Sequence, residues 1–307
     1  MTSGKAAALS TVGTTVAGIS AGIGGQLIWG FFPVYWKLLA GVPAFEVLLH
    51  RIVWSFALLI VVVWLRGLSG RLKQALRSRR LMAVLGATTL LISANWLVFI
   101  WAANSGKVLE ISLGFFINPT FNVLLGMAFL GERLRPQQAL AVLLAAAGVV
   151  NLSIASGGVP WIALLLAATT ALYGLLRKAN PIDPVLGLAV ETGMLTPLAL
   201  AYLVGLHWWG LGAFGQQAGL SVSLLLVMAG AVTAIPLLLF VFAAHRLRYI
   251  TMGLLQYISP TMHFLLAVLL YGETLTTAHM ATFACIWGGV VLYLADSYRL
   301  SRVPVAA

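Results

Sequence analysis

The chain has 307 residues, of which 61% are hydrophobic and 8% are charged. An ordinary soluble domain is roughly a quarter charged, so this composition excludes a soluble globular protein. The net charge of +11 would suggest a nucleic-acid partner in a soluble chain, but here the basic residues lie between long apolar runs. Each run reaches the ~20 residues that cross a bilayer core, and none alternates as barrel strands do.

The sequence therefore predicts an all-α integral membrane protein. The first 17 residues have one Lys and no compact apolar core before a cleavage site, so we expect an uncleaved first helix instead of a signal peptide. An even number of spans places both termini on one side. We expect ten transmembrane helices, at residues 18–36, 44–65, 81–103, 109–130, 136–153, 160–177, 184–205, 220–243, 251–270 and 278–296.

The basic residues predict the orientation. With the amino terminus inside, only Lys37 and Lys107 lie in outer segments, and Arg51 lies within a helix. This is a strong positive-inside bias, so we expect both termini in the cytoplasm. The stretch RLKQALRSRR (71–80) is interpreted as a topology determinant and lipid-headgroup contact, and no nucleic acid is expected. The inner basic residues are Lys5, Arg66, Arg71, Lys73, Arg77, Arg79, Arg80, Arg133, Arg135, Arg177, Lys178, Arg246, Arg248, Arg299 and Arg302.

The two halves of the sequence resemble each other. A shift of 141 residues pairs Pro119 with Pro260, Thr120 with Thr261, Gly131 with Gly272, Glu132 with Glu273, Leu134 with Leu275 and Gly148 with Gly289. So many matches at one shift indicate a duplication. Five spans in each half would make the second repeat inverted, as in many transporters. The expected parts are a cytoplasmic segment 1–17, the repeats 18–153 and 160–296, and a cytoplasmic tail 297–307.

The Gly-Glu-x-Leu segments have a structural interpretation. Gly131 and Gly272 can adopt the left-handed conformation that ends a helix. Glu132 and Glu273 are then expected at the positive start of the next helix, where a carboxylate is favourable.

Polar residues follow one face of the fourth and of the ninth expected span. Asn118 and Asn122 are four residues apart, and Gln256, Ser259 and His263 share a face by similar spacing. The 141-residue shift pairs Asn118 with Ser259 and Asn122 with His263. Because polar atoms in hydrocarbon are costly unless they are partnered or face water, we expect one shared cavity near mid-membrane.

Prolines interrupt the same two helices. Pro119 and Pro260 have no amide hydrogen, so each leaves the carbonyl four residues earlier, Phe115 or Gln256, without its helical partner. A freed carbonyl can bind a donor, or the proline only kinks the helix. Both interpretations stay open at this point.

Two ionisable residues lie deep in expected spans. Arg51 is about 10 Å from the outer edge at 1.5 Å per residue. It could bind an anionic group, extend to the interface, or pair with Glu46 or Glu110. Glu191 is about 10 Å from the inner edge. It could carry a coupling proton or a cationic substrate group, or neutralise a nearby basic side chain. We expect Glu191 or His263 to make transport pH-dependent.

Metal and disulfide chemistry have little support. Cys285 is the only cysteine, which excludes a disulfide framework and a thiolate metal site. Glu46 and His50 are four apart on one helix face, but two ligands do not make a metal site. We expect no metal and no cofactor.

Four stretches closely resemble the RarD branch of the EamA family, within the drug/metabolite transporter superfamily: IWGFFPVYWKLLAGVPAFEVLLHRIVWS (28–55), NWLVFIWAAN (95–104), LGFFINPTFNVLLGMAFLGERLRP (113–136) and LLQYISPTMHFLLAVLLYGE (254–273). The resemblance implies a permease of the bacterial inner membrane with the ten-helix fold. Members are often described as chloramphenicol-sensitivity proteins. The sequence departs from the branch pattern at Ser259, where Gly is expected, and at His263, where an apolar residue is expected.

We therefore predict a secondary transporter, not an enzyme, that moves a small metabolite or drug-like solute by alternating access. Chloramphenicol-related export and amino-acid or metabolite transport are the candidate activities. The alternatives are a membrane-embedded lipid-modifying enzyme and a subunit without a translocation path. Expected partners are the solute, membrane lipids and protons as a candidate coupling ion, and the expected oligomeric state is monomer or homodimer. Candidate substrate-binding residues are Arg51, Asn95, Asn118, Asn122, Glu191, Gln256, Tyr257, Ser259 and His263, with Pro119 and Pro260 as helix breakers.

Overall fold

The structure is a computed structural model, and it describes residues 3–131, 136–215, 219–247, 251–252 and 255–301. These residues form helices joined by short connections, and no strand occurs among them. The all-α prediction is therefore confirmed for this part of the chain. Within it, eight helices have the length and apolar composition needed to cross a membrane, and two shorter apolar segments follow at Ile258–Leu270 and Thr277–Leu292.

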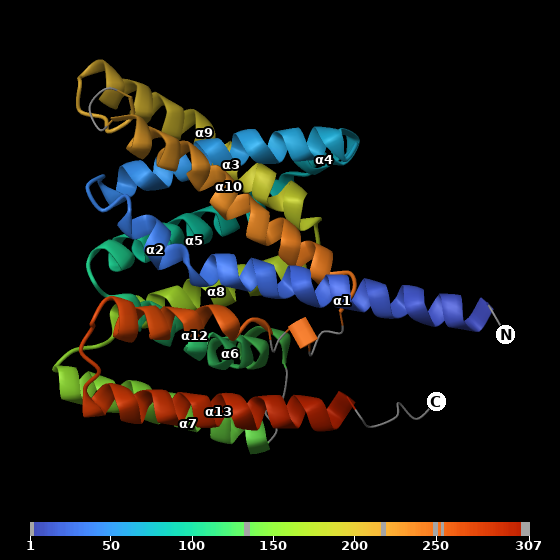
Figure 1. The fold of residues 1–307 in the computed structure, drawn as a ribbon, viewed down its shortest axis with the longest axis vertical. Coiled ribbons are helices and arrows are strands. Elements are labelled where there is room, and N and C mark those ends of the chain that lie inside the picture. The colour runs from blue at the N-terminus through green and yellow to red at the C-terminus, as the bar shows by residue number, and fades with distance from the viewer. Residues whose placement is uncertain (1–2, 132–135, 216–218, 248–250, 253–254, 302–307) are drawn as a thin grey trace. The chain divides into compact units, whose positions relative to one another are not determined.

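The helices are labelled in Figure 1. In chain order they are α1 (Ser3–Gly30), α2 (Phe32–Lys37), α3 (Ala44–Leu65), α4 (Ser69–Arg77), α5 (Arg79–Asn104), α6 (Val108–Leu130), α7 (Pro136–Ser156), α8 (Trp161–Ala179), α9 (Pro184–Trp208), α10 (Gly219–Ala244), α12 (Ile258–Leu265), the π-helix η1 (Leu266–Leu270) and α13 (Thr277–Ser301).

Helix ends follow local chemistry. Asp183 starts α9, because its carboxylate accepts hydrogen bonds from the amides of Val185 (2.9 Å) and Leu186 (3.3 Å), and Pro184 occupies the first helical position. Gly131 ends α6 with φ of 66°, and Gly272 has φ of 61°. The predicted left-handed glycines are thus confirmed.

The prediction for Glu273 was wrong. Its two carboxylate oxygens accept hydrogen bonds from the amides of Val108 (2.7 Å) and Leu109 (2.8 Å), so it caps the start of α6 and not the start of the next helix. The hydroxyl of Thr276 caps α13 instead, by accepting from the amide of His279 at 3.3 Å. Glu132, which the 141-residue shift pairs with Glu273, lies outside the described residues.

Three boundaries differ from the sequence prediction. The first helix reaches back to Ser3, where the sequence analysis placed a segment before the span. A short helix, α4, occupies the expected connection between the second and third spans. The ninth span consists of α12 and η1, whose wider turn is closed by the amide of Tyr271 donating to the carbonyl of Leu266 at 2.9 Å. Such π-helical turns are rare and occur often at functional sites.

The chain forms two compact units. The first unit contains residues 1–89 and 181–259, and the second contains residues 90–180 and 260–307. In the first unit α1 packs against α10, and α3 packs against α9 and α10. In the second unit α7 runs beside α13 and α6 packs against α8 (Figure 1). Each unit therefore combines helices from both expected repeats.

Glycines allow the closest helix contacts within each unit. In the first unit, a Cβ atom at Gly230 of α10 would lie 2.4 Å from the carbonyl carbon of Trp54 in α3. In the second unit, a Cβ atom at Gly114 of α6 would lie 2.8 Å from the carbonyl oxygen of Ala163 in α8. Small residues bring membrane helices together in this way, because packing, and not the hydrophobic effect, drives their association.

Candidate functional site

Polar side chains of α5 and α6 meet α8 inside the second unit. The Asn95 amide nitrogen lies within hydrogen-bond distance of the Leu166 carbonyl (3.2 Å) and of the hydroxyls of Thr169 (2.8 Å) and Thr170 (3.1 Å). Asn95 is buried. An amide has two hydrogens, so these three acceptors exceed its donors and the group can switch among them.

The Asn118 face of α6 also lies against α8. The Asn118 amide donates to the Ala167 carbonyl at 3.5 Å, and its oxygen accepts from the Asn122 amide at 2.8 Å. Asn118 is half-buried and Asn122 is exposed. One end of this polar group is thus held by the neighbouring helix, and the other is open.

His263 is buried among aromatic rings. Its ring centroid lies 5.5 Å from that of Phe99 in α5 and 5.8 Å from that of Phe115 in α6. The side chain is 2% exposed. His263 and Asn118 therefore belong to the same unit, but no hydrogen bond between them is seen among the described residues.

Ser259 and Gln256 belong to the first unit. The Ser259 hydroxyl lies 2.7 Å from the carbonyl oxygen of Gln26 and 2.6 Å from its side-chain oxygen. Both residues are buried, whereas Gln256 is exposed and Tyr257 is half-buried. A hydroxyl has one hydrogen, so Ser259 donates to one of these oxygens at a time.

Arg51 is buried in the first unit beside aromatic rings. Its guanidinium carbon lies 5.4 Å from the ring centroid of Phe32 and 5.0 Å from that of Trp36. Arg51 itself is 3% exposed. A guanidinium on aromatic faces is favourable through cation–π attraction, which strengthens when the charge is desolvated.

The two acidic residues suggested as partners of Arg51 have other contacts. Glu46 accepts from the amide of Ala213 at 2.6 Å, and its carboxylate lies 4.0 Å from His50 Nε2. Glu46 thereby links the connection between α9 and α10 to α3. Glu110 lies 3.6 Å from the ammonium group of Lys107.

Glu191 is buried in α9 of the first unit and is 1% exposed. The Thr88 hydroxyl of α5 donates to its carboxylate at 2.7 Å. Thr88, Gln26 and Thr169 were not among the residues predicted to form the site. The sequence shows each of them only as a Thr or Gln within an apolar span. This pattern does not distinguish a site residue from a residue that makes an ordinary contact between helices.

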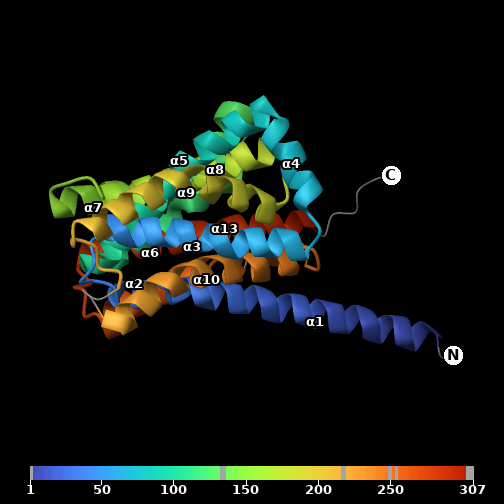
Figure 2. The same cartoon turned by 90° about the horizontal axis from the view of Figure 1, so that it is seen from above.

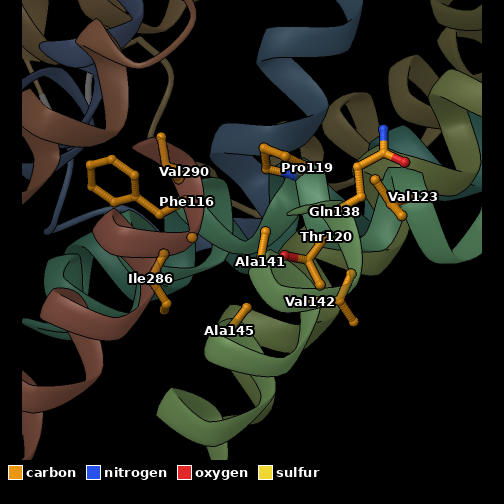
Figure 3. A pocket seen from close by; sticks show the side chains of 11 residues that line it. Phe116, Pro119, Thr120, Val123, Gln138, Ala141, Val142, Ala145, Ile286 and Val290 are labelled. Carbon is orange, nitrogen blue, oxygen red and sulfur yellow. The ribbon is translucent and has the colours of Figure 1, made fainter. Parts of the chain in front are cut away.

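The structure also contains a small open groove in the second unit. It lies at Pro119 of α6, between α7 and α13, and Figure 3 shows apolar side chains around Thr120 and Gln138. Asn118, Asn122 and His263 do not line it. On a helix, residues 116, 119, 120 and 123 face away from residues 114, 118 and 122, so the groove and the polar stripe occupy different faces.

Metal ligation has no support in the described part of the chain. Within residues 3–131, 136–215, 219–247, 251–252 and 255–301, no three His, Cys, Asp or Glu side chains come close enough to hold an ion.

Comparison with known proteins identifies the family. The EamA-like transporter family matches residues 16–154. Protein RarD of Salmonella typhimurium is 44% identical over 288 residues, which cover 94% of this chain and 98% of the relative. An uncharacterized transporter of Pseudomonas aeruginosa is 42% identical, with 94% of this chain and 96% of the relative covered.

Two further comparisons agree with these. The chloramphenicol-sensitive protein RarD of Pseudomonas aeruginosa is 34% identical over 93% of this chain and 96% of its own length. One solved crystal structure has a TM-score of 0.58 at 22% identity, covering 94% of this chain and 98% of that one, and it supports the fold alone. Identity above 30% along nearly the whole length shows common ancestry, and the chain belongs to the RarD branch of the EamA-like transporter family.

Proposed function

We propose that the protein is a secondary transporter of the bacterial inner membrane that moves a small metabolite or drug-like solute by alternating access. The observation that carries this proposal is similarity over nearly the full length to relatives named as transporters. In the part of the chain that the structure describes, eight long apolar helices and two shorter ones agree with a multi-pass membrane protein. Solutes related to chloramphenicol are candidates because one relative is named for sensitivity to that drug.

The proposed transporter has ten spans in two inverted five-helix repeats, 18–153 and 160–296. Matched contacts within the two units support this. Ser259 bonds the Gln26 carbonyl in the first unit, and Asn118 bonds the Ala167 carbonyl in the second. The 141-residue shift relates both members of these pairs, since 118 + 141 = 259 and 26 + 141 = 167. A duplicated fold would produce such a repetition.

Close packing repeats in the same way. Gly114 faces Ala163 in the second unit, and Gly22 faces Leu255 in the first. The shift again relates the two pairs, since 114 + 141 = 255 and 22 + 141 = 163. Repetition of both a hydrogen bond and a glycine contact supports two copies of one helix arrangement.

Solute recognition is assigned to polar groups within the spans. In the second unit these are Asn95, Asn118, Asn122 and His263, and in the first unit they are Arg51, Glu191, Gln256, Tyr257 and Ser259. Asn118 and Asn122 offer amide donors and acceptors at mid-helix, beside Pro119. The Asn95 amide has two hydrogens and three acceptors within reach, so a polar solute can replace one of these acceptors.

Protons are the proposed coupling ion, and Glu191 and His263 are the candidate carriers. Both are buried within the spans, where a change of protonation is coupled to conformation. Glu191→Gln should make transport indifferent to an imposed proton gradient. A gradient response that survives in this variant and in His263→Leu would exclude both residues as carriers.

Two substitutions and a matched control test the recognition site. Asn118→Leu and His263→Leu should impair solute transport in proteoliposomes more than they impair expression, because they remove polar groups without removing volume. Thr120→Val changes the opposite face of α6 and should leave transport intact. A thiol-reactive probe at Asn122→Cys, in a Cys285→Ala background, should react more slowly when the transported solute is present. Normal transport by both Leu variants would overturn the assignment.

A further inference from the structure

A dense group of exposed cations surrounds α4 in the first unit. The segment from residue 66 to residue 80 contains no acidic residue. Its cations are all exposed, and the proposed transport site does not use them. They are Arg66, Arg71, Lys73, Arg77, Arg79 and Arg80, and we call them the α4 basic patch.

The helix inside this patch is amphipathic. Leu68, Leu72, Ala75 and Leu76 recur at intervals of three and four residues, so they share one side of α4. Ala75 is buried and α4 packs against α9, whereas Leu76 is 50% exposed. The apolar side is therefore only partly covered by protein and leaves a leucine available to lipid.

The direction of α4 suits a membrane surface. Figure 2 shows α4 running across the direction of α3, which is one of the membrane-spanning helices. Trp64, near the end of α3, is 72% exposed. Trp concentrates at membrane–water interfaces, and an amphipathic helix that starts there can run along the headgroups.

Helix stability does not explain two of the cations. Arg79 and Arg80 lie in the first turn of α5, at the positive end of its dipole, where a cation is unfavourable. The hydroxyl of Ser78 accepts from the amide of Leu81 at 3.3 Å, so this start is already capped. The helix dipole therefore does not favour two arginines at this position.

We infer that α4 lies in the headgroup layer and that the α4 basic patch binds the phosphates of anionic phospholipids. The ligand is a phosphodiester that carries a net negative charge, in the leaflet that faces the 66–80 segment. Arg and Lys bind phosphate through charge-assisted hydrogen bonds, and each cation near an anionic surface contributes about 1 kcal/mol. Leucines on the other side of α4 hold the helix at this depth.

Lipid-selective quenching tests this inference without any transported solute, so its outcome is independent of the proposed transport function. The full chain, with Cys285→Ala and Gln74→Cys, carries an environment-sensitive fluorophore at position 74. It is reconstituted with equal mole fractions of phosphatidylcholine and phosphatidylglycerol, one of which is brominated in its acyl chains. We expect brominated phosphatidylglycerol to quench severalfold more strongly than brominated phosphatidylcholine, and added salt to reduce the difference.

Two variants that each lose three positive charges test whether the α4 basic patch causes the lipid preference. Arg71→Gln, Lys73→Gln and Arg77→Gln together should strongly reduce the preference, since about 1 kcal/mol per cation corresponds to about fivefold each, and the other three cations of the patch remain. Lys37→Gln, Lys107→Gln and Lys178→Gln remove the same three charges elsewhere and should preserve it. If the patch variant does not reconstitute, the salt titration of the unsubstituted patch still tests the inference.

Three results would overturn the inference. These are equal quenching by the two lipids, no quenching by either, or a preference in the patch variant as large as that of the unsubstituted patch. Displacement by inorganic phosphate at constant ionic strength would assign the patch to a soluble phosphate ligand and also overturn the lipid assignment.

Discussion

Two carboxylates in this protein bind across helices to partners that are far away in sequence. Glu273 caps the first turn of α6, 165 residues away from Val108. Glu191 takes a hydrogen bond from Thr88, 103 residues away. The sequence identified both carboxylates as notable but could not identify these partners, because a pattern of spacing reports a helix face and not what lies opposite it.

Substituting Glu273 tests its role as a cap. Glu273→Gln should destabilise the protein by about 1 kcal/mol, since the neutral amide has one acceptor oxygen where the carboxylate has two. Amide hydrogen exchange over residues 107–112 should rise with it. Glu110→Gln is the matched control, because its contact with Lys107 is partly exposed and should contribute less. Unchanged exchange in Glu273→Gln would show that the cap is dispensable.

Arg51 is predicted to contribute to the binding of acidic solutes. Arg51→Lys should raise the KM of an acidic solute in proteoliposomes, because an ammonium group cannot form the bidentate bonds of a guanidinium. A neutral solute is the control and should be transported as before. Identical kinetics for both solutes would leave Arg51 with a structural role.

At the scale of helices, length and hydropathy were reliable guides. The expected span 44–65 coincides with α3, and 184–205 begins where α9 begins. Neither α4 nor η1 was predicted, because residues 66–80 were interpreted only as a basic connection between two spans. A π-turn depends on how α12 meets its neighbours, and LAVLL is equally suited to an ordinary helix.

Glycine contacts give a stability prediction at this scale. Gly230→Ala should cost about 1–3 kcal/mol, because its methyl group would overlap the backbone of Trp54 and Ser55. Gly86→Ala, in α5, has no atom within 4 Å of the new methyl group and should be neutral or stabilising by up to ~1 kcal/mol. Thermal unfolding in detergent compares the two. Equal stability would contradict the packing described between α3 and α10.

At the scale of the whole molecule, the sequence indicated a duplication but did not indicate the two compact units. The 141-residue shift pairs residues of the two halves, whereas each unit contains helices from both halves. Self-similarity reports the ancestry of a segment, and packing decides which segments associate. For this reason Ser259 and His263, four residues apart on one predicted face, belong to different units.

Orientation in the membrane follows from charge. We expect both termini and position 73 in the cytoplasm, because nearly all basic residues then lie inside. In a Cys285→Ala background, Lys73→Cys should react with a membrane-impermeant thiol reagent only after the cells are opened. Lys107→Cys, on the expected outer side, should react in intact cells. Labelling of position 73 from outside would reverse the orientation.

Solute counterflow tests the central claim, that this protein is a secondary transporter, most directly. Purified protein is reconstituted into liposomes loaded with one unlabelled compound from a panel of amino acids and drugs that includes chloramphenicol, and uptake of the same labelled compound is followed. A carrier should accumulate the label transiently for at least one compound, without ATP, and Asn118→Leu should reduce that accumulation at equal protein content. Label that enters no faster than in protein-free liposomes across the whole panel would contradict the account.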